Sequence, residues 1–204
     1  MSLPRRTRRN RRTQLPEGLD QESLTDMLAR LRISQWDLAL IGDGSGSSWM
    51  HGCGWAGVLI DRFTKGRRLF YGGMNVGSIN LAELMPYMHA LSWYHENFGR
   101  DRLKRADHGV LHVHIITDSQ VICQHGSKIN AGQNPSSNRS AWACMAQFIK
   151  EGYILHYHHI PRCTVALNVV ADKVAGVSRL TLQGIELQDK ETREQLSIYD
   201  YNPL

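Results

Sequence analysis

Apolar residues in the first third of the chain form three short runs that predict β-strands. The runs lie at residues 36–41, 55–61 and 68–74, and the connections between them are short and rich in Gly. Short connections between consecutive strands are typical of an antiparallel meander. We therefore expect the domain to begin with three antiparallel strands.

From residue 80 the apolar spacing changes from strand-like to helical. Leu81, Leu84, Met88, Leu91 and Tyr94 recur every three or four positions, which predicts a helix over 80–97 with Pro86 inside it. The remaining expected elements are a basic connection at 100–105, a strand at 110–117, a short helix at 119–125, a polar loop at 126–140, a helix at 141–151, a strand at 153–160 and a helix at 169–178. This order predicts an α/β fold with a mixed five-stranded sheet, in which parallel strands are added to the meander and helices cover both faces.

The ends of the chain differ in composition from this domain, which we place at residues 35–182. Residues 1–18 form a basic arm, residues 19–34 contain a short helix, and residues 183–204 form a C-terminal extension. The short helix has one apolar stripe, made of Leu24, Met27, Leu28 and Leu31. We expect the stripe to dock on the domain rather than on a partner.

The net charge of +5 arises entirely in the arm. Six of the 24 Lys and Arg side chains lie in residues 1–12, which contain no acid, so the other 192 residues hold 18 basic and 19 acidic side chains. Such a block is unstructured on its own and favours a polyanion such as nucleic acid; a solubilising tail is the alternative. The six residues are Arg5, Arg6, Arg8, Arg9, Arg11 and Arg12.

Other features limit the location and the class of the protein. No apolar run reaches the length of a membrane span, and the Arg-rich start lacks the apolar residues of a secretory signal or a transit helix. The four cysteines form no C-x-x-C pair, which favours free thiols in a reducing compartment such as the cytoplasm, with nuclear, organellar and viral origins left open. His112-Val-His114 and His156-Tyr-His158 have zinc-ligand spacing, but the polar face of a half-buried strand has the same spacing and is favoured.

Four acids occupy positions where an α/β sheet gathers side chains beside a cleft. Asp43 ends the first strand, Glu83 lies in the first long helix, Asp118 ends the fourth strand and Asp172 opens the last helix. Converging carboxylates repel one another unless cations are bound, and their oxygens select Mg²⁺ or Mn²⁺. Two such ions can clamp a phosphodiester. Separate, solvated acids are the alternative.

The residues around these acids carry a resemblance to a known family. Asp43-Gly-Ser45, Asn80-Leu-Ala-Glu83-Leu, Thr117-Asp118-Ser-Gln120 and Asn168-Val-Val-Ala-Asp172 resemble, in order, the D-G-S, N-x-x-E-L, T-D-S-Q and N-x-x-A-D motifs of type 1 ribonucleases H. The resemblance covers roughly residues 36–180.

The resemblance implies a ribonuclease H-like fold and hydrolysis of the RNA strand of an RNA–DNA hybrid, leaving a 5′-phosphate and a 3′-hydroxyl. The four acids would hold two Mg²⁺ or Mn²⁺ ions, with Asp43 bridging them. Ser45, Asn80, Ser119 and Gln120 would contact the nucleic acid from the minor groove, where the 2′-hydroxyls lie.

The sequence departs from the family pattern in three places. Arg162 stands where many members have a loop His, ten residues before the last acid; we expect Arg162 to act there, with His159 as the alternative. The segment 46–57 contains Trp49, Met50, His51 and Cys53 instead of a small polar turn. The loop 126–140 holds only Lys128 and Arg139, so the substrate-handling basic protrusion of some bacterial members is absent or short. The arginine arm could supply the nucleic-acid affinity that such a protrusion provides.

Three functions remain open at this point: a hybrid-specific endoribonuclease, which we favour; a nuclease of the same fold for another nucleic acid; and a non-catalytic nucleic-acid-binding or assembly module. Retention of all four acids argues against the last of these.

Overall fold

The computed structural model describes residues 24–46, 52–75, 77–106, 109–162 and 164–182. The predicted basic arm, the C-terminal extension and the Trp49–His51 segment lie outside the described residues. None of the helices in the described part combines the length and the apolar character that a membrane span requires.

The described residues form one mixed sheet of five strands in the order β3-β2-β1-β4-β5. Antiparallel pairing joins β1 (Leu38–Gly46), β2 (Cys53–Asp61) and β3 (Arg67–Met74). Parallel pairing adds β4 (Leu111–Thr117) to β1 and then β5 (Tyr153–His159) to β4. The predicted fold class is therefore confirmed.

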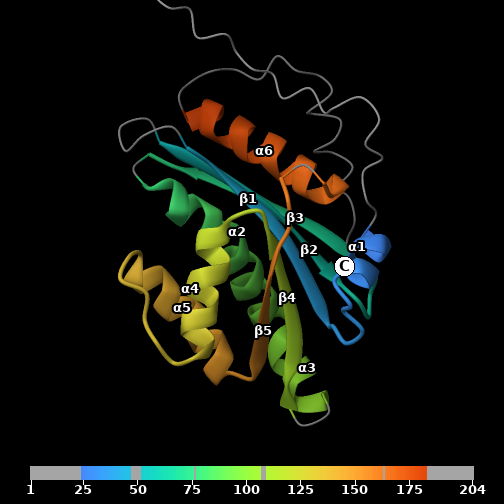
Figure 1. Cartoon of the computed structure of the whole chain (residues 1–204). Coiled ribbons are helices and arrows are strands. Elements are labelled where there is room, and N and C mark those ends of the chain that lie inside the picture. The colour runs from blue at the N-terminus through green and yellow to red at the C-terminus, as the bar shows by residue number, and fades with distance from the viewer. Residues whose placement is uncertain (1–23, 47–51, 76, 107–108, 163, 183–204) are drawn as a thin grey trace, which may run out of the picture.

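Helices cover both faces of the sheet (Figure 1). The helical elements are α1 (Leu24–Arg30), α2 (Ile79–Tyr94), the π-helical turn η1 (His95–Gly99), α3 (Arg100–Arg105), α4 (Gln120–Asn130), α5 (Arg139–Lys150) and α6 (Ala166–Leu182). One apolar core lies between the sheet and α2, α4 and α5. A second core lies on the opposite face under α6 and includes Met27 and Leu28 of α1, so the predicted docking of this helix on the domain is confirmed.

Several predicted boundaries were wrong, and at two of them polar residues hide a helix. Residues 100–105 form α3, whose Leu103 packs on the core although basic residues dominate its sequence. The first part of the predicted loop 126–140 continues α4 to Asn130, where Ile129 is buried. Helix α6 begins at Ala166, so Asp172 lies in its second turn rather than at its start.

Two helices approach the strand backbones so closely that only glycine fits beneath them. A Cβ atom on Gly44 of β1 would lie 2.5 Å from the backbone nitrogen of Glu83 in α2. On the other face, a Cβ atom on Gly54 of β2 would lie 2.0 Å from the carbonyl oxygen of Ala175 in α6. Since interiors are densely packed, a methyl group at either position must displace a helix.

This packing predicts opposite effects for two Gly→Ala substitutions. Gly54→Ala should lower the free energy of unfolding by about 2 kcal/mol or more, because α6 must move away from the sheet. Gly176→Ala, in α6 itself, meets no atom within 4 Å and should stabilise by roughly 0.5–1 kcal/mol through helix propensity. Thermal or urea unfolding of both variants measures the difference; equal stability would contradict the close approach.

Candidate active site

The point where β1 and β4 separate brings two of the predicted acids together. Parallel pairing between the strands ends at Ile41 and Ile116. Asp43 and Asp118 each lie two residues beyond this last pair, at the same edge of the sheet. Asp43 remains paired with Ala56 of β2. It therefore lies within β1, whereas the sequence predicted it at the end of the strand.

Helix α2 contributes a third carboxylate to the same place. The helix begins after Ser78, whose side chain accepts a hydrogen bond from the Leu81 backbone N–H and so caps the first turn. Glu83 follows above Gly44, where the helix touches β1. Ligand oxygens of Asp43, Glu83 and Asp118 all lie within 4.8 Å of one another, and no other such group of three occurs among the described residues.

Two of these carboxylates carry buried oxygens that no protein group satisfies. Asp43 is 2% exposed; its Oδ1 accepts a hydrogen bond of 2.7 Å from the Gly44 backbone N–H, whereas its Oδ2 has no partner. Oε2 of Glu83 is likewise buried without a partner. Unsatisfied buried carboxylate oxygens are costly, and a divalent cation with oxygen ligands would satisfy both. The donor set therefore fits a hard metal ion.

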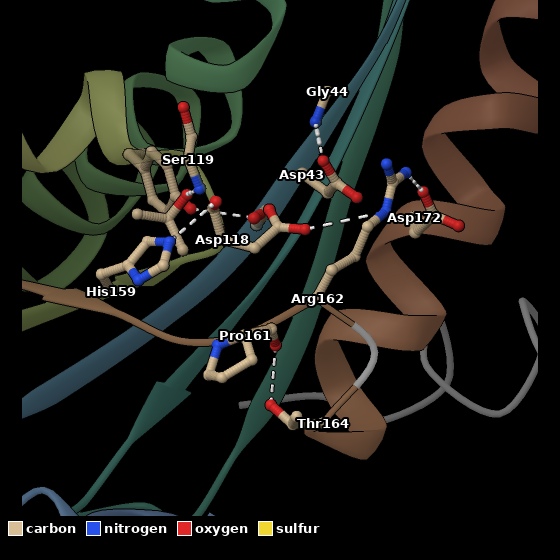
Figure 2. Close-up of polar contacts among 12 residues, drawn as sticks. Asp43, Gly44, Asp118, Ser119, His159, Pro161, Arg162, Thr164 and Asp172 are labelled. Atoms are coloured by element: carbon tan, nitrogen blue, oxygen red, sulfur yellow. Dashed lines mark hydrogen bonds and ion pairs between the residues drawn. The ribbon is translucent and has the colours of Figure 1, made fainter. Parts of the chain in front are cut away.

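The fourth acid, Asp172, is held by an arginine instead. Figure 2 shows the Arg162 side chain between Asp118 and Asp172. Its Nη2 donates a hydrogen bond to Oδ1 of Asp172, and its Nε lies 3.8 Å from Oδ2 of Asp118. Arg162 thus places one positive charge beside the acid cluster, while 62% of its side chain stays exposed.

His159, the alternative to Arg162, also reaches this edge of the sheet but makes a different contact. Its Nε2 lies 3.1 Å from the backbone oxygen of Asp118 (Figure 2). Its contact is therefore with the backbone of the acid, whereas Arg162 contacts the carboxylate.

Burial raises the pKa of each member of the cluster of three. The pKa of Asp43 rises to about 9, mainly because burial disfavours its charge and secondarily because Glu83, Asp118 and Asp172 repel it. The pKa of Glu83 rises to about 8 by burial and the charge of Asp118, although Arg162 opposes the shift. Burial also raises the pKa of Asp118, against the effect of Arg162.

A pocket of about 360 Å³ opens over the acids. Ser45, one of the residues expected to contact nucleic acid, lines this pocket. Asn80 lies in the first turn of α2, Ser119 is the N-cap of α4, and the exposed Gln120 begins that helix. Ser45 is thus the one member of this set that lines the pocket, while Asn80 precedes Glu83 in α2 and Ser119 and Gln120 directly follow Asp118.

Ile79 also lines the pocket, although none of the sequence motifs includes it. Its side chain is 41% exposed although it is large and apolar, and it precedes Asn80 at the start of α2. An apolar residue directly after a helix cap, outside the buried stripe, is the only sequence feature that could have indicated it.

The predicted histidine pairs form a separate array on β4 and β5. Nδ1 of His112 lies 3.1 Å from Nε2 of His156, and Nδ1 of His114 lies 2.8 Å from Nε2 of His158. The rings of His114 and His156 stack at 4.5 Å. The contacts link imidazoles across the two strands, and the buried His114 also has its Nε2 2.9 Å from the backbone oxygen of Gln35.

Solved structures share this architecture. The N-terminal RNase H domain of a Mycobacterium tuberculosis protein, solved as a fusion with maltose binding protein, is 13% identical, with a TM-score of 0.52, and the alignment covers 74% of this chain and 100% of that one. RNase H1 from the halophilic archaeon Halobacterium salinarum is 16% identical, with a TM-score of 0.51 and coverages of 69% and 96%. LC11-RNase H1, isolated from compost and solved with an RNA/DNA hybrid, is 17% identical, with a TM-score of 0.55 and coverages of 72% and 99%.

These similarities show that the chain has the ribonuclease H-like fold predicted from the motifs. No protein-family model matches the sequence, and no curated protein matches it either.

The raised pKa of Asp43 predicts how the metal-free protein responds to pH. Between its ordinary value of 3.8 and about 9 the folded protein keeps a proton that the unfolded chain releases, so stability falls as pH rises through this range. Asp43→Asn removes the free-energy cost of keeping this carboxyl protonated above its ordinary pKa. The substitution should therefore stabilise the metal-free protein by at least about 1 kcal/mol at pH 8, or about 2–4 °C in Tm. The gain should shrink toward pH 5. Thermal unfolding in EDTA tests this, with the exposed Asp101→Asn as the matched control; parallel stability curves would contradict it.

Proposed function

We propose that this chain is a metal-dependent endonuclease that hydrolyses the RNA strand of RNA–DNA hybrids. The observation that carries the proposal is the cluster of Asp43, Glu83 and Asp118, with two buried carboxylate oxygens that lack partners, on a ribonuclease H-like fold. A binding module would gain nothing from burying repelling carboxylates, because their desolvation lowers stability.

Asp43, Glu83 and Asp118 would hold the divalent ion or ions, with Asp172 as a further ligand. When bound, Mg²⁺ or Mn²⁺ would lower the pKa of a coordinated water molecule and would neutralise charge that develops on the phosphodiester. Contacts within the chain orient these carboxylates. The Gly44 backbone N–H donates a hydrogen bond to Asp43, and Arg162 donates one to Asp172. Metal binding by Asp172 would compete with its contact to Arg162.

Arg162 is the stronger candidate for the loop role expected from the resemblance. Its guanidinium lines the pocket and contacts two carboxylates, so it already lies where a phosphate would enter. Arginine stays charged at neutral pH and donates several hydrogen bonds in one plane, which suits a phosphate in the transition state or in the departing product. His159 instead faces a backbone carbonyl.

Ser45, Asn80, Ser119 and Gln120 would guide the substrate across the pocket. They neighbour the acids along β1, α2 and α4, and their hydroxyl and amide groups can hydrogen-bond to sugars and base edges. A wide, shallow minor groove that displays 2′-hydroxyls would distinguish RNA from DNA at such contacts. The complex of LC11-RNase H1 with an RNA/DNA hybrid, at a TM-score of 0.55, supports a hybrid as the substrate.

Cleavage of a labelled RNA–DNA hybrid in Mg²⁺ or Mn²⁺ tests the proposal directly. Asp118→Asn removes a ligand charge while keeping the shape of the side chain, so it should lower the cleavage rate by at least about 10³-fold, while hybrid affinity changes little. Double-stranded RNA and double-stranded DNA run in parallel measure substrate choice.

Glu96→Gln is the matched control, because this exposed carboxylate of η1 lies outside the acid cluster. Full cleavage by Asp118→Asn would rule out the assigned site. Folded wild-type protein that cuts none of the substrates would instead favour the binding module, and preference for another duplex would favour a different nuclease.

Deletion of residues 1–12 tests the proposed role of the arginine arm. If Arg5, Arg6, Arg8, Arg9, Arg11 and Arg12 contact phosphates, the slope of log K against log salt should flatten by about 0.9 for each duplex phosphate that the arm neutralises. Hybrid affinity at several salt concentrations measures this slope. An unchanged slope would leave the solubilising role as the explanation.

A further inference from the structure

A second pocket, of about 940 Å³, lies at the opposite end of the sheet from the acids. Its walls come from the segment before β1, the turn after β2, helix α3 and the start of β4. Asp37 and Arg62 line it, whereas the acid cluster lies toward the other end of β1. At about 3.3 Å per strand residue, the start of β1 is roughly 17 Å from Asp43.

Arg62, Arg102 and Arg105 line this pocket, and further basic residues lie in the two chain segments that contribute them. Two short segments, 62–68 and 100–105, hold eight of the 16 Lys and Arg side chains in the described part of the chain. They are Arg62, Lys65, Arg67, Arg68, Arg100, Arg102, Lys104 and Arg105, and all except Arg102 are exposed. The segments meet where Arg102 of α3 forms an ion pair of 2.9 Å with the buried Asp61 at the end of β2.

The nearby acids leave this positive charge largely uncompensated. Asp61 is neutralised by Arg102, Asp101 lies 3.6 Å from Lys104, and Asp37 accepts a hydrogen bond from the His112 backbone N–H. Arg62 donates a hydrogen bond to the backbone carbonyl of Trp36, which is a neutral acceptor. The basic side chains therefore exceed the acids at this end of the fold and can bind an anion.

Two aromatic rings stand among these cations. Phe63 is 65% exposed, and the Arg102 guanidinium carbon lies 4.6 Å from the centre of its ring. Trp36 lines the same pocket, with Arg62 at 5.9 Å from its ring. Arg102 packs over one side of the Phe63 ring, and the exposed remainder of the ring provides a stacking surface for a flat, anionic ligand.

We infer that this basic and aromatic surface binds unpaired nucleotides of a nucleic-acid strand. Phosphates would contact Arg62 and Arg105, and a base would stack on Phe63. This combination of cations and aromatic rings is typical of single-strand binding, since the faces of bases inside a duplex are already covered by their neighbours. The inference rests on the proposed function for the identity of the polymer, and it adds a binding site for a strand that continues beyond the duplex.

Binding of a short, labelled single strand to the full-length chain tests this inference, with a blunt duplex of equal length for comparison. Phe63→Ala should weaken single-strand binding about tenfold, which corresponds to the loss of one stacked base. Phe63→Tyr should retain the affinity. Arg105→Ala should lower the salt slope for the single strand by about 0.7, the value for one phosphate contact. Fluorescence anisotropy in EDTA at several salt concentrations measures all three.

Arg139→Ala is the matched control, since this exposed arginine lies at the start of α5. The inference is overturned if Phe63→Ala and Arg105→Ala bind the single strand as Arg139→Ala does. Equal weakening for the blunt duplex would overturn the assignment to unpaired nucleotides. Hybrid cleavage by the same protein separates the two proposals: it reports on the acid cluster, and this binding comparison does not depend on it.

Discussion

Helices α2 and α6 pack on opposite faces of the same central strands and approach their backbones at glycines. Gly44 lies against Glu83 of α2, and Gly54 lies against Ala175 of α6. These approaches set how near the two helices can bring acidic side chains to the end of β1. A larger residue at either glycine would move a helix outward, because the interior is close-packed and leaves no free volume for a methyl group. The geometry of the candidate site therefore depends on two residues that have no side chains.

Burying these acids together lowers the free energy of unfolding of the metal-free protein. Asp43 and Glu83 are buried beside each other and near Asp118, and burial raises the pKa of both to values near or above neutrality. Arg162 offsets part of the repulsion from an exposed loop position. Such an arrangement lowers stability unless a cation is present, and groups kept at this cost are typical of functional sites. The charge balance at this edge thus supports the proposed function.

The two ends of the sheet carry opposite chemistry. The end where β1 and β4 diverge gathers carboxylates, while the end where these strands begin gathers Arg62, Arg105 and their basic neighbours around Phe63. The region 126–140 contributes only two basic residues, so positive surface for a polyanion has to come from elsewhere in the chain. The basic surface beside α3 and the arginine arm are the two sources proposed above, and phosphate contacts by either would depend on salt.

The sequence by itself determined the order of most elements and the mixed sheet, and it indicated four candidate acids, because strand and helix periodicity and short motifs are local patterns. It failed at α3 and at the end of α4, where polar residues hide the one apolar side chain that packs. Only the tertiary structure decided that Asp172 pairs with Arg162 while the other three acids converge, and that four separate segments enclose the basic pocket. Burial and charge between distant segments determine such contacts, and these depend on distances that no spacing along the chain contains.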